Sequence, residues 1–442
     1  MSQRNSRRGF MQEAAALGVG LWAAGGIQVP VSASANERIR LACIGIGGKG
    51  ESDSADAARF GDIVAICDID SQRLGKRSEA EAFSKAKKFA DYRKMFDEMA
   101  KDIDAITVST PDHSHAPASV MGMRLGKHCF CQKPLTHSVS EARLMADLAR
   151  EKKLATQMGN QGTAGNNLRW AAALIKSGAV GTVKEVHVWT NRPIWAQGGP
   201  RPKAAEVPEN VNWDLFLGPA KIRDYAPGAY HPFAWRGWWD FGTGALGDMA
   251  CHTFNMPFMA LGLKDPTTIA AEHSGHNGDS YPAWSVIKFA FPEANGRPAI
   301  PVVWYDGGKK PSRELFGGKA LPDSGALIVG DKDTLWAVGD YCERFELLSG
   351  AKAAEVDYKH SPGHFEEWIN AIKGGEPAMS NFADYAGPLS ETILLGNLAV
   401  YAGKGPKSEG KIIEWDAKNL TAKNAPEVAH VIKREYREGW SL

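Results

Sequence analysis

The sequence lacks an excess of charge of either sign. Its 52 Lys and Arg residues nearly balance its 51 Asp and Glu residues, which leaves a net charge of +1. Residues 1–35 carry three Arg and one Glu, so the rest of the chain has 49 basic and 50 acidic residues, a net charge of −1. Proteins that bind nucleic acid or anionic membranes electrostatically need a basic surplus. We therefore expect neither as a partner.

The sequence also lacks a long, strongly apolar run. Its most apolar stretch, residues 14–31, is interrupted by glycines and is short for a bilayer, which needs about 20 apolar residues. Residues 6–11, Ser-Arg-Arg-Gly-Phe-Met, outline a twin-arginine export signal before it, and the small residues Ala33 and Ala35 follow it. We expect a signal peptide over residues 1–35, a periplasmic protein, and no membrane insertion after cleavage. A retained anchor is the alternative.

Cysteine is scarce, and its pattern predicts neither disulfides nor a metal site. The six cysteines are scattered, and most fall within or beside expected buried strands, so we interpret them as reduced core residues. No His-Glu-x-x-His or Cys-x-x-Cys spacing is present. We therefore expect no metal centre.

What the chain does have is a short apolar strand that leads directly into a glycine-rich turn. The turn reads Gly-x-Gly-x-x-Gly and consists of Gly45, Ile46, Gly47, Gly48, Lys49 and Gly50. In a dinucleotide-binding turn the first glycine permits the tight bend, the second admits a pyrophosphate, and the third lets the helix pack on the strand. The pyrophosphate then lies at the N-terminus of the helix, which favours an anion. This turn predicts a dinucleotide site.

A second apolar strand ends at Asp68, about twenty residues further along, where a carboxylate can accept a hydrogen bond from a ribose 2′-hydroxyl. The negative charge of Asp68 would repel the 2′-phosphate of NADP, and the first basic residue after it is Arg73. NAD is therefore the expected cofactor, with NADP less favoured.

Strand and helix patterns alternate up to residue 158, which predicts a doubly wound parallel sheet. The expected strands are residues 39–45, 63–68, 105–109, 128–131 and 155–158, and the expected helices are residues 71–89, 92–100, 115–125 and 140–152. After Gly159 the residues at 182–190, 283–291 and 299–305 alternate between apolar and polar, which is typical of a sheet with one solvated face. Late helices are expected at 364–373 and 388–402. We predict a dinucleotide-binding domain over residues 36–158 and an α+β domain with an open, mainly antiparallel sheet over residues 159–442.

Four motifs together resemble the Gfo/Idh/MocA family of NAD(P)-dependent sugar and cyclitol oxidoreductases. They are the glycine turn, Ser-Thr-Pro-Asp-His-Ser-His at 109–115, Cys-Gln-Lys-Pro-Leu-Thr at 131–136 and Gly-Asp-Met-Ala-Cys-His at 247–252. The chain departs from the family's Glu-Lys-Pro signature by carrying Gln132 in place of the glutamate. Any role of that carboxylate is therefore lost, while Lys133 and Pro134 remain. The resemblance covers about residues 38 to 405 and implies a Rossmann domain followed by an open-sheet domain.

The resemblance also implies a set of cofactor contacts beyond the glycine turn and Asp68. These are Ser109, Thr110, Pro111, His113, His115, Gln132, Lys133, Asn160, Trp235 and Arg236. Asn191 and Arg192, which follow a strand, are expected substrate contacts. We expect a small carbohydrate substrate and a homodimer or homotetramer assembled through the open sheet.

Lys133, Asp248 and His252 are the expected catalytic residues. Oxidation of a carbinol needs a base for the hydroxyl proton and a cation that steadies the developing charge. Lys133 ends a strand, and Asp248 and His252 are spaced i, i+4 on one helix face. His252 can be the base, with Asp248 bonded either to the imidazole or to a substrate hydroxyl. A zinc site built on the same pair would need a third ligand.

Three functions remain open from the sequence. The first is a sugar or cyclitol oxidoreductase. The second is an NAD-dependent glycoside hydrolase that acts by transient oxidation, elimination and re-reduction. In the related hydrolases the lysine of the signature is replaced, so the retained Lys133 favours net dehydrogenation. The third is a non-catalytic NAD-bound protein, in which Lys133, Asp248 and His252 would have no purpose.

Overall fold

The computed structural model describes residues 38–403 and 410–442, which belong to one compact unit. The expected signal peptide and its cleavage site lie outside the described residues. All six cysteines are buried free thiols, as the sequence predicted. Within the described ranges, no helix has the length and apolar character that crossing a membrane requires.

The first half of the described chain forms a six-stranded sheet in which every neighbouring pair is parallel. In spatial order its strands are β3 (Lys87–Phe89), β2 (Gly61–Cys67), β1 (Ile39–Ile44), β4 (Ala105–Val108), β5 (His128–Cys131) and β6 (Thr156–Met158). The connecting helices are α2 (Lys49–Ala58), α3 (Ser71–Ser78), α4 (Tyr92–Met99), α5 (His115–Arg124) and α6 (Val139–Glu151). The doubly wound parallel sheet is confirmed, and the expected strands are found to within two residues at each end.

One expected helix, residues 71–89, is wrong in its second half. The Asp70 side chain caps α3 by accepting from the backbone N–H groups of Gln72 and Arg73, but the helix ends at Ser78. A single 3₁₀ turn and the edge strand β3 follow, and β3 pairs in parallel with β2. Residues 79–86 contain good helix formers, so local propensity favours a helix here. The hydrogen bonds offered by the edge of β2 override that propensity.

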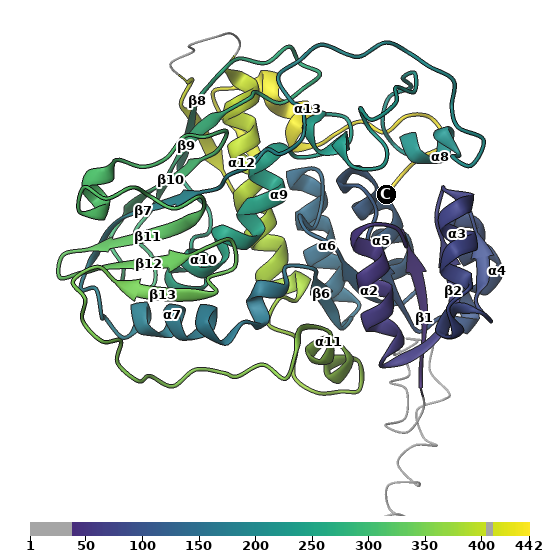
Figure 1. Cartoon of the computed structure of the whole chain (residues 1–442), viewed down its shortest axis with the longest axis horizontal. Helices are drawn as coiled ribbons and strands as arrows, with labels where there is room; N and C mark the ends of the chain where they lie inside the picture. The colour runs from purple at the N-terminus through teal and green to yellow at the C-terminus, as the bar shows by residue number, and fades with distance from the viewer. Residues whose placement is uncertain (1–37, 404–409) are drawn as a thin grey trace, which may run out of the picture. The chain divides into compact units, whose positions relative to one another are not determined.

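The second half forms a nine-stranded sheet that is antiparallel except where β7 pairs with β10. In spatial order its strands are β13 (Arg344–Leu347), β12 (Thr334–Val338), β11 (Gly325–Gly330), β7 (Val183–Trp189), β10 (Ile300–Tyr305), β9 (Ser285–Phe291), β8 (Thr268–His273), β14 (Ile413–Asp416) and β15 (Thr421–Ala422). The helices of this half are α7 (Asn166–Lys176), α8 (Trp213–Leu217), α9 (Gly244–Thr253), α10 (Asn255–Leu261), α11 (His364–Ile372), α12 (Gly387–Ala402) and α13 (Ala429–Ile432). The mainly antiparallel open sheet is confirmed (Figure 1).

Helix α12 is the central packing element. It is apolar on nearly all sides and buried along most of its length. It packs on β8 and β9, where Ile287 and Phe289 are buried while Lys288 is exposed. It also packs against α6 of the first half and α9 of the second (Figure 1). This contact holds α9 beside the carboxyl edge of the parallel sheet, where the candidate site lies.

Helix α11 packs away from its sequence neighbours, on the parallel sheet. Its Phe365 ring stacks on Phe130 of β5 with the ring centroids 4.4 Å apart, and the indole N–H of Trp368 donates to the carbonyl of Ala155. The late part of the chain therefore completes the core around β5 and β6.

Candidate active site

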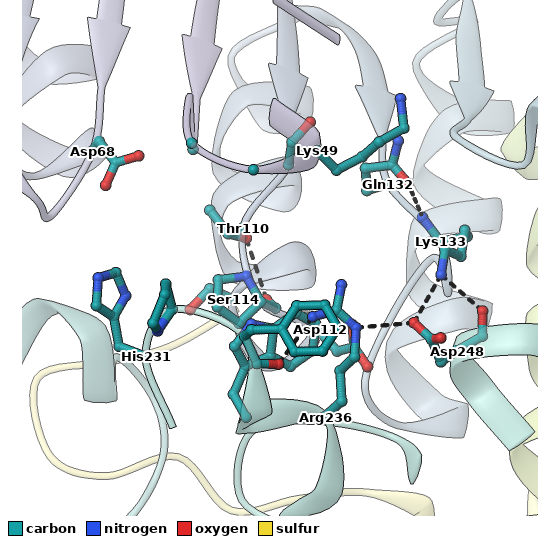
Figure 2. A pocket seen from close by; sticks show the side chains of 18 of the residues that line it. Lys49, Asp68, Thr110, Asp112, Ser114, Gln132, Lys133, His231, Arg236 and Asp248 are labelled. Atoms are coloured by element: carbon teal, nitrogen blue, oxygen red, sulfur yellow. Dashed lines mark hydrogen bonds and ion pairs between the residues drawn. The ribbon is translucent and has the colours of Figure 1, made fainter. Parts of the chain in front are cut away.

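A cavity of about 510 Å³ opens at the carboxyl ends of the parallel strands. This edge is where ligands bind in open α/β sheets. The glycine turn and the ends of β2, β4 and β5 line one side of the cavity, and α9 and residues 231–236 line the other. Figure 2 shows side chains from both sides pointing into the same space.

The glycine turn has the geometry that a dinucleotide requires. Gly45 has φ of +76°, and a Cβ there would lie 2.7 Å from the carbonyl oxygen of Ser109. A Cβ on Gly50 would lie 2.0 Å from the carbonyl oxygen of Gly45, so α2 approaches β1 only because this residue is glycine. Helix α2 begins at Lys49, which lines the cavity together with Gly47 and Gly48. A helix N-terminus of this kind suits a pyrophosphate, so the turn fits NAD.

Asp68 lies at the cavity end of β2 and is 7% exposed. Its two carboxylate oxygens accept from the backbone N–H groups of Ile46 and Asp70, each at 3.0 Å. Burial raises the pKa of Asp68, and the two backbone donors and the charge of Arg73 offset the rise only in part. Arg73 also lines the cavity, and a Cβ on Gly47 would lie 2.2 Å from its guanidinium. A cation therefore lies beside the carboxylate expected to bind the ribose.

Lys133, Asp248 and Arg236 form one charged cluster. The Nζ of Lys133 donates to Oδ1 of Asp248 at 2.9 Å and to its backbone carbonyl at 2.7 Å, while Nε of Arg236 donates to the same Oδ1 at 3.1 Å (Figure 2). Burial alone would raise the pKa of Asp248, but the charges and hydrogen bonds of Lys133 and Arg236 lower it far below its usual range. Asp248 is therefore ionised, and its Oδ2 stays free of these two partners.

His252 lies one helical turn beyond Asp248 and is 4% exposed. Burial and the charge of Lys133 hold its pKa well below the usual range, so the ring is neutral. Its Nδ1 is buried without a partner, which leaves Nε2 as the nitrogen accessible from the cavity. The ring packs against Tyr341 with the centroids 4.6 Å apart. Of the two expected roles of Asp248, a bond to the imidazole is not formed in this structure.

Most of the residues predicted from the sequence meet in this cavity. Those that line it are Gly45, Gly47, Gly48, Lys49, Asp68, Ser109, Thr110, Pro111, Gln132, Lys133, Arg192, Trp235, Arg236, Asp248 and His252. Trp195 lines it too, with the guanidinium of Arg236 5.9 Å from its ring centroid. Segments that are 200 residues apart in the chain therefore share one site.

The other predicted residues do not face the cavity. They are Ile46, Gly50, His113, His115, Asn160 and Asn191. Both ring nitrogens of His113 lie against the backbone carbonyls of Phe216 and Phe241, and those of His115 lie against the carbonyls of Thr110 and Pro134. Burial lowers the pKa of His113 to about 3 and that of His115 to about 4. In this structure the turn after β4 directs both rings inward and α5 begins at His115, so neither ring lines the cavity where the cofactor contact was expected.

Asn160 and Asn191 are displaced for different reasons. Asn160 is fully buried, and its Oδ1 accepts from the hydroxyl of Ser380. Its neighbour Gln161 lines the cavity instead. Asn191 is exposed and accepts from the guanidinium of Arg192, which does line the cavity. In both places the expected strand end is right and the side chain that reaches the cavity belongs to the next residue.

The sequence reasoning missed Asp112 and Tyr341. Asp112 is 3% exposed, lines the cavity and accepts from the hydroxyl of Thr243 at 2.6 Å. Burial raises its pKa to about 7, although Thr243 and the nearby cations oppose the rise. Its position in the 109–115 motif could have identified it, but the prediction for this motif named the two histidines instead. Tyr341 lies in the turn between β12 and β13 and belongs to no motif, so only the fold brings it to His252.

Metal ligation finds no support in the same geometry. Across residues 38–403 and 410–442, no cluster of three or more His, Cys, Asp or Glu side chains is placed to hold a metal ion. The carboxylate of Asp248 is instead engaged by two cations.

Comparison with known proteins identifies the family of the chain. A sequence model of the oxidoreductase family with an NAD-binding Rossmann fold matches residues 39–160, and a model of that family's C-terminal alpha/beta domain matches residues 170–298. Levoglucosan dehydrogenase of Pseudarthrobacter phenanthrenivorans is 24% identical over 174 residues, which is 39% of this chain and 36% of that protein. Glycosyl hydrolase family 109 protein 2 of Akkermansia muciniphila is 29% identical over 154 residues, 33% of this chain and 32% of that protein.

These matches span about a third of each curated relative, 36% and 32% of their lengths. Structural similarity covers more of the chain than these sequence matches do. The structure of the WlbA dehydrogenase of Bordetella pertussis, solved with NADH and UDP-GlcNAcA, has a TM-score of 0.59 and 17% identity, and covers 86% of this chain and 99% of that one. With both domains matched and the glycine turn formed, the chain belongs to the Gfo/Idh/MocA oxidoreductase family, and its N-terminal domain binds NAD.

Proposed function

We propose that this protein is an oxidoreductase that transfers a hydride between NAD and a hydroxyl-bearing carbon of a sugar, glycoside or cyclitol. The observation that carries the proposal is the placement of Lys133, Asp248 and His252 in the same cavity as the glycine turn. A binding protein would have no need of a buried cation, an ionised carboxylate and a neutral imidazole around one space.

The proposed chemistry assigns each side chain a task. Bound NAD supplies the hydride acceptor. His252 takes the proton of the substrate hydroxyl at Nε2, because its ring is neutral and its Nδ1 is enclosed. Lys133 has three N–H donors and uses two of them on Asp248, so the third can bind the reacting oxygen and stabilise the charge that develops there.

Asp248 and Arg236 hold this arrangement in place. Asp248 fixes Lys133 Nζ through two contacts, and Arg236 balances the cluster from the other side (Figure 2). The free Oδ2 of Asp248 can accept from a second hydroxyl of the substrate. A polyol that offers two adjacent hydroxyls would therefore satisfy both groups, which favours sugars and cyclitols over simple alcohols.

The test is to identify the products by mass spectrometry after the purified protein is incubated with a panel of free sugars, cyclitols and glycosides. An oxidoreductase yields a carbonyl product two mass units lighter than its substrate, with stoichiometric reduction of the dinucleotide or of a second carbonyl substrate. If no member of the panel is oxidised or cleaved while NAD remains bound, the protein is a binding protein and the proposal fails.

A second candidate is glycoside hydrolysis through transient oxidation, elimination and re-reduction. The similarity to glycosyl hydrolase family 109 proteins supports it. The same product panel separates the two functions, because hydrolysis releases the aglycone and a sugar of unchanged oxidation state with no net reduction of NAD. The retained Lys133 favours the oxidoreductase, because the related hydrolases have another residue in place of this lysine of the signature.

We propose further that the protein is exported to the periplasm by the twin-arginine route with NAD already bound. A dinucleotide lost outside the cytoplasm would not be replaced, so tight binding follows; a Kd of 100 nM corresponds to about 9.5 kcal/mol. The purified protein should then carry dinucleotide and turn over without added NAD. Replacing Arg7 and Arg8 with Lys should keep the protein in the cytoplasm. Apoprotein that depends on millimolar NAD would refute tight retention.

The oligomeric state is the remaining expectation. We propose a homodimer or homotetramer assembled through the outer face of the nine-stranded sheet, where half-buried apolar side chains such as Val303 alternate with exposed polar ones such as Lys288. Light scattering of the purified protein gives the mass directly. A monomer at micromolar concentration would contradict this assembly.

A further inference from the structure

A buried carboxylate lies directly behind the cofactor side of the cavity. Asp53 of α2 is 1% exposed and does not itself line the cavity. Its Oδ2 accepts from the hydroxyl of Ser109 and from Nε2 of Gln132, both at 2.8 Å, and its Oδ1 accepts from Nζ of Lys49 at 2.5 Å. All three partners line the cavity. Asp53 therefore touches the cavity only through other side chains.

These partners come from three separate segments. Lys49 belongs to the glycine turn after β1, Ser109 follows β4 and Gln132 follows β5. One carboxylate thus ties together the three loops that form the carboxyl edge of the parallel sheet. The connection continues to the reacting groups, because Oε1 of Gln132 accepts from the backbone N–H of Lys133 at 3.2 Å. Figure 2 shows Lys49, Gln132 and Lys133 in succession along this edge.

The same contact explains the departure of this chain from the Glu-Lys-Pro signature. A glutamate at position 132 would place a second carboxylate oxygen 2.8 Å from Oδ2 of Asp53 in a site closed to solvent. Two carboxylates at that separation repel each other strongly, which raises one pKa of the pair and makes ionisation of both groups costly. Gln132 supplies an N–H donor where a glutamate would supply a charge.

We propose that Asp53 is a positioning residue that holds Lys49 and Gln132 at the cofactor side of the cavity, and that Asp53 and Gln132 are a matched pair that must change together. The proposal rests on the proposed function only for its assumption that NAD occupies this cavity. An i, i+4 ion pair with Lys49 that served the helix alone would leave Asp53 solvated and would involve neither Ser109 nor Gln132.

The test measures NADH release and NAD affinity in the full-length protein, by nicotinamide fluorescence and titration calorimetry. The variants are Asp53→Asn, Gln132→Glu and the double variant. Each single change should weaken NAD binding about tenfold, the size expected for a buried charge contact that is broken. The double variant restores one carboxylate facing one amide and should bind within about threefold of the parent.

Two further measurements separate positioning from general stability. In Gln132→Glu the two carboxylates take up one shared proton as the pH falls from 8 to 5, which removes their repulsion, so NAD affinity should rise over this range. The parent should show no comparable slope. Asp56→Asn is the matched control, because Asp56 is a half-buried carboxylate on the same helix that does not line the cavity and pairs with the surface residue Arg59. It should leave NAD affinity unchanged.

Losses that add in the double variant, or a Gln132→Glu protein that binds NAD like the parent at pH 8, overturn the proposal. If Gln132→Glu fails to fold, recovery of folded, NAD-binding protein in the double variant supports the pairing, and no recovery refutes it. If the parent itself does not bind NAD, the proposed function fails instead, and the two failures are therefore distinct.

Discussion

The substitution Asp112→Asn should stabilise the protein above neutral pH and have little effect near pH 4. Asp112 is buried in the cavity wall, and burial raises the pKa of its carboxyl from 3.8 to about 7. The folded protein therefore holds a proton between these pH values that the unfolded chain releases. Stability falls as the pH rises through this window, because the folded state binds more protons than the unfolded state.

The magnitude follows from the shift. A pKa shift from 3.8 to about 7 corresponds to about 4 kcal/mol of folding free energy. This is the upper limit of the stability that the variant gains, because the cavity can relax around the charge. Asparagine has the shape of the protonated acid, and its carbonyl oxygen can still accept from the hydroxyl of Thr243. The variant should therefore avoid the free-energy cost of ionising a buried carboxyl, and it should keep the hydrogen bond from Thr243.

The assay is urea unfolding of parent and variant, followed by tryptophan fluorescence at intervals from pH 4 to pH 8. The difference in unfolding free energy should be near zero at pH 4, grow through pH 5 to 7, and level off above. Equal pH slopes for the two proteins, or a variant that is less stable at pH 8, would refute the assignment of a raised pKa to Asp112.

Asp248→Asn is a control for which the opposite change in stability is expected. Burial would raise the pKa of Asp248, but Lys133 and Arg236 lower it. The variant leaves two cations without their counter-charge, so at neutral pH it should lose about 3–5 kcal/mol. The loss should shrink as the pH falls below 3.8, where the unfolded carboxyl of the parent takes up a proton. A loss that is the same at pH 3 and pH 7 would contradict the ion-pair explanation.

Three further outcomes are expected. Lys133→Ala and His252→Ala should each lower turnover about 10²- to 10⁴-fold, with NAD binding retained at least in the His252 variant; near-normal turnover in that variant would remove His252 as the base. Asp68→Ala should shift the measured affinity ratio towards NADP, because Arg73 stays in the cavity while the repelling carboxylate is gone, and an unchanged ratio would exclude Asp68 from selecting the cofactor. Tyr341→Phe keeps the ring contact with His252 and should raise KM for the sugar more than it lowers kcat, as steady-state kinetics would show; unaltered kinetics would place the hydroxyl outside the substrate site.

The sequence alone determined the features that depend on neighbouring residues. The glycine turn needs a positive φ at Gly45 and no side chain at Gly50, and both requirements are visible as glycines at fixed spacing. The pairing of Asp248 and His252 on α9 follows from helical periodicity. The parallel sheet follows from apolar strands that alternate with helical stretches. The open sheet follows from apolar residues that alternate with polar ones. Both are local patterns in the sequence.

The tertiary structure decided whatever depends on contacts between distant segments. The edge strand β3 forms because β2 offers it hydrogen bonds, against the helical propensity of residues 79–86. Asp112, rather than His113 or His115, faces the cavity because Phe216 and Phe241 enclose the His113 ring. The nine-stranded sheet brings the ring of Tyr341 into contact with His252, and Asp53 accepts a hydrogen bond from Gln132, which is 79 residues away in the chain. Side-chain direction in a turn and contacts between remote segments are set by packing, which a one-dimensional pattern does not encode.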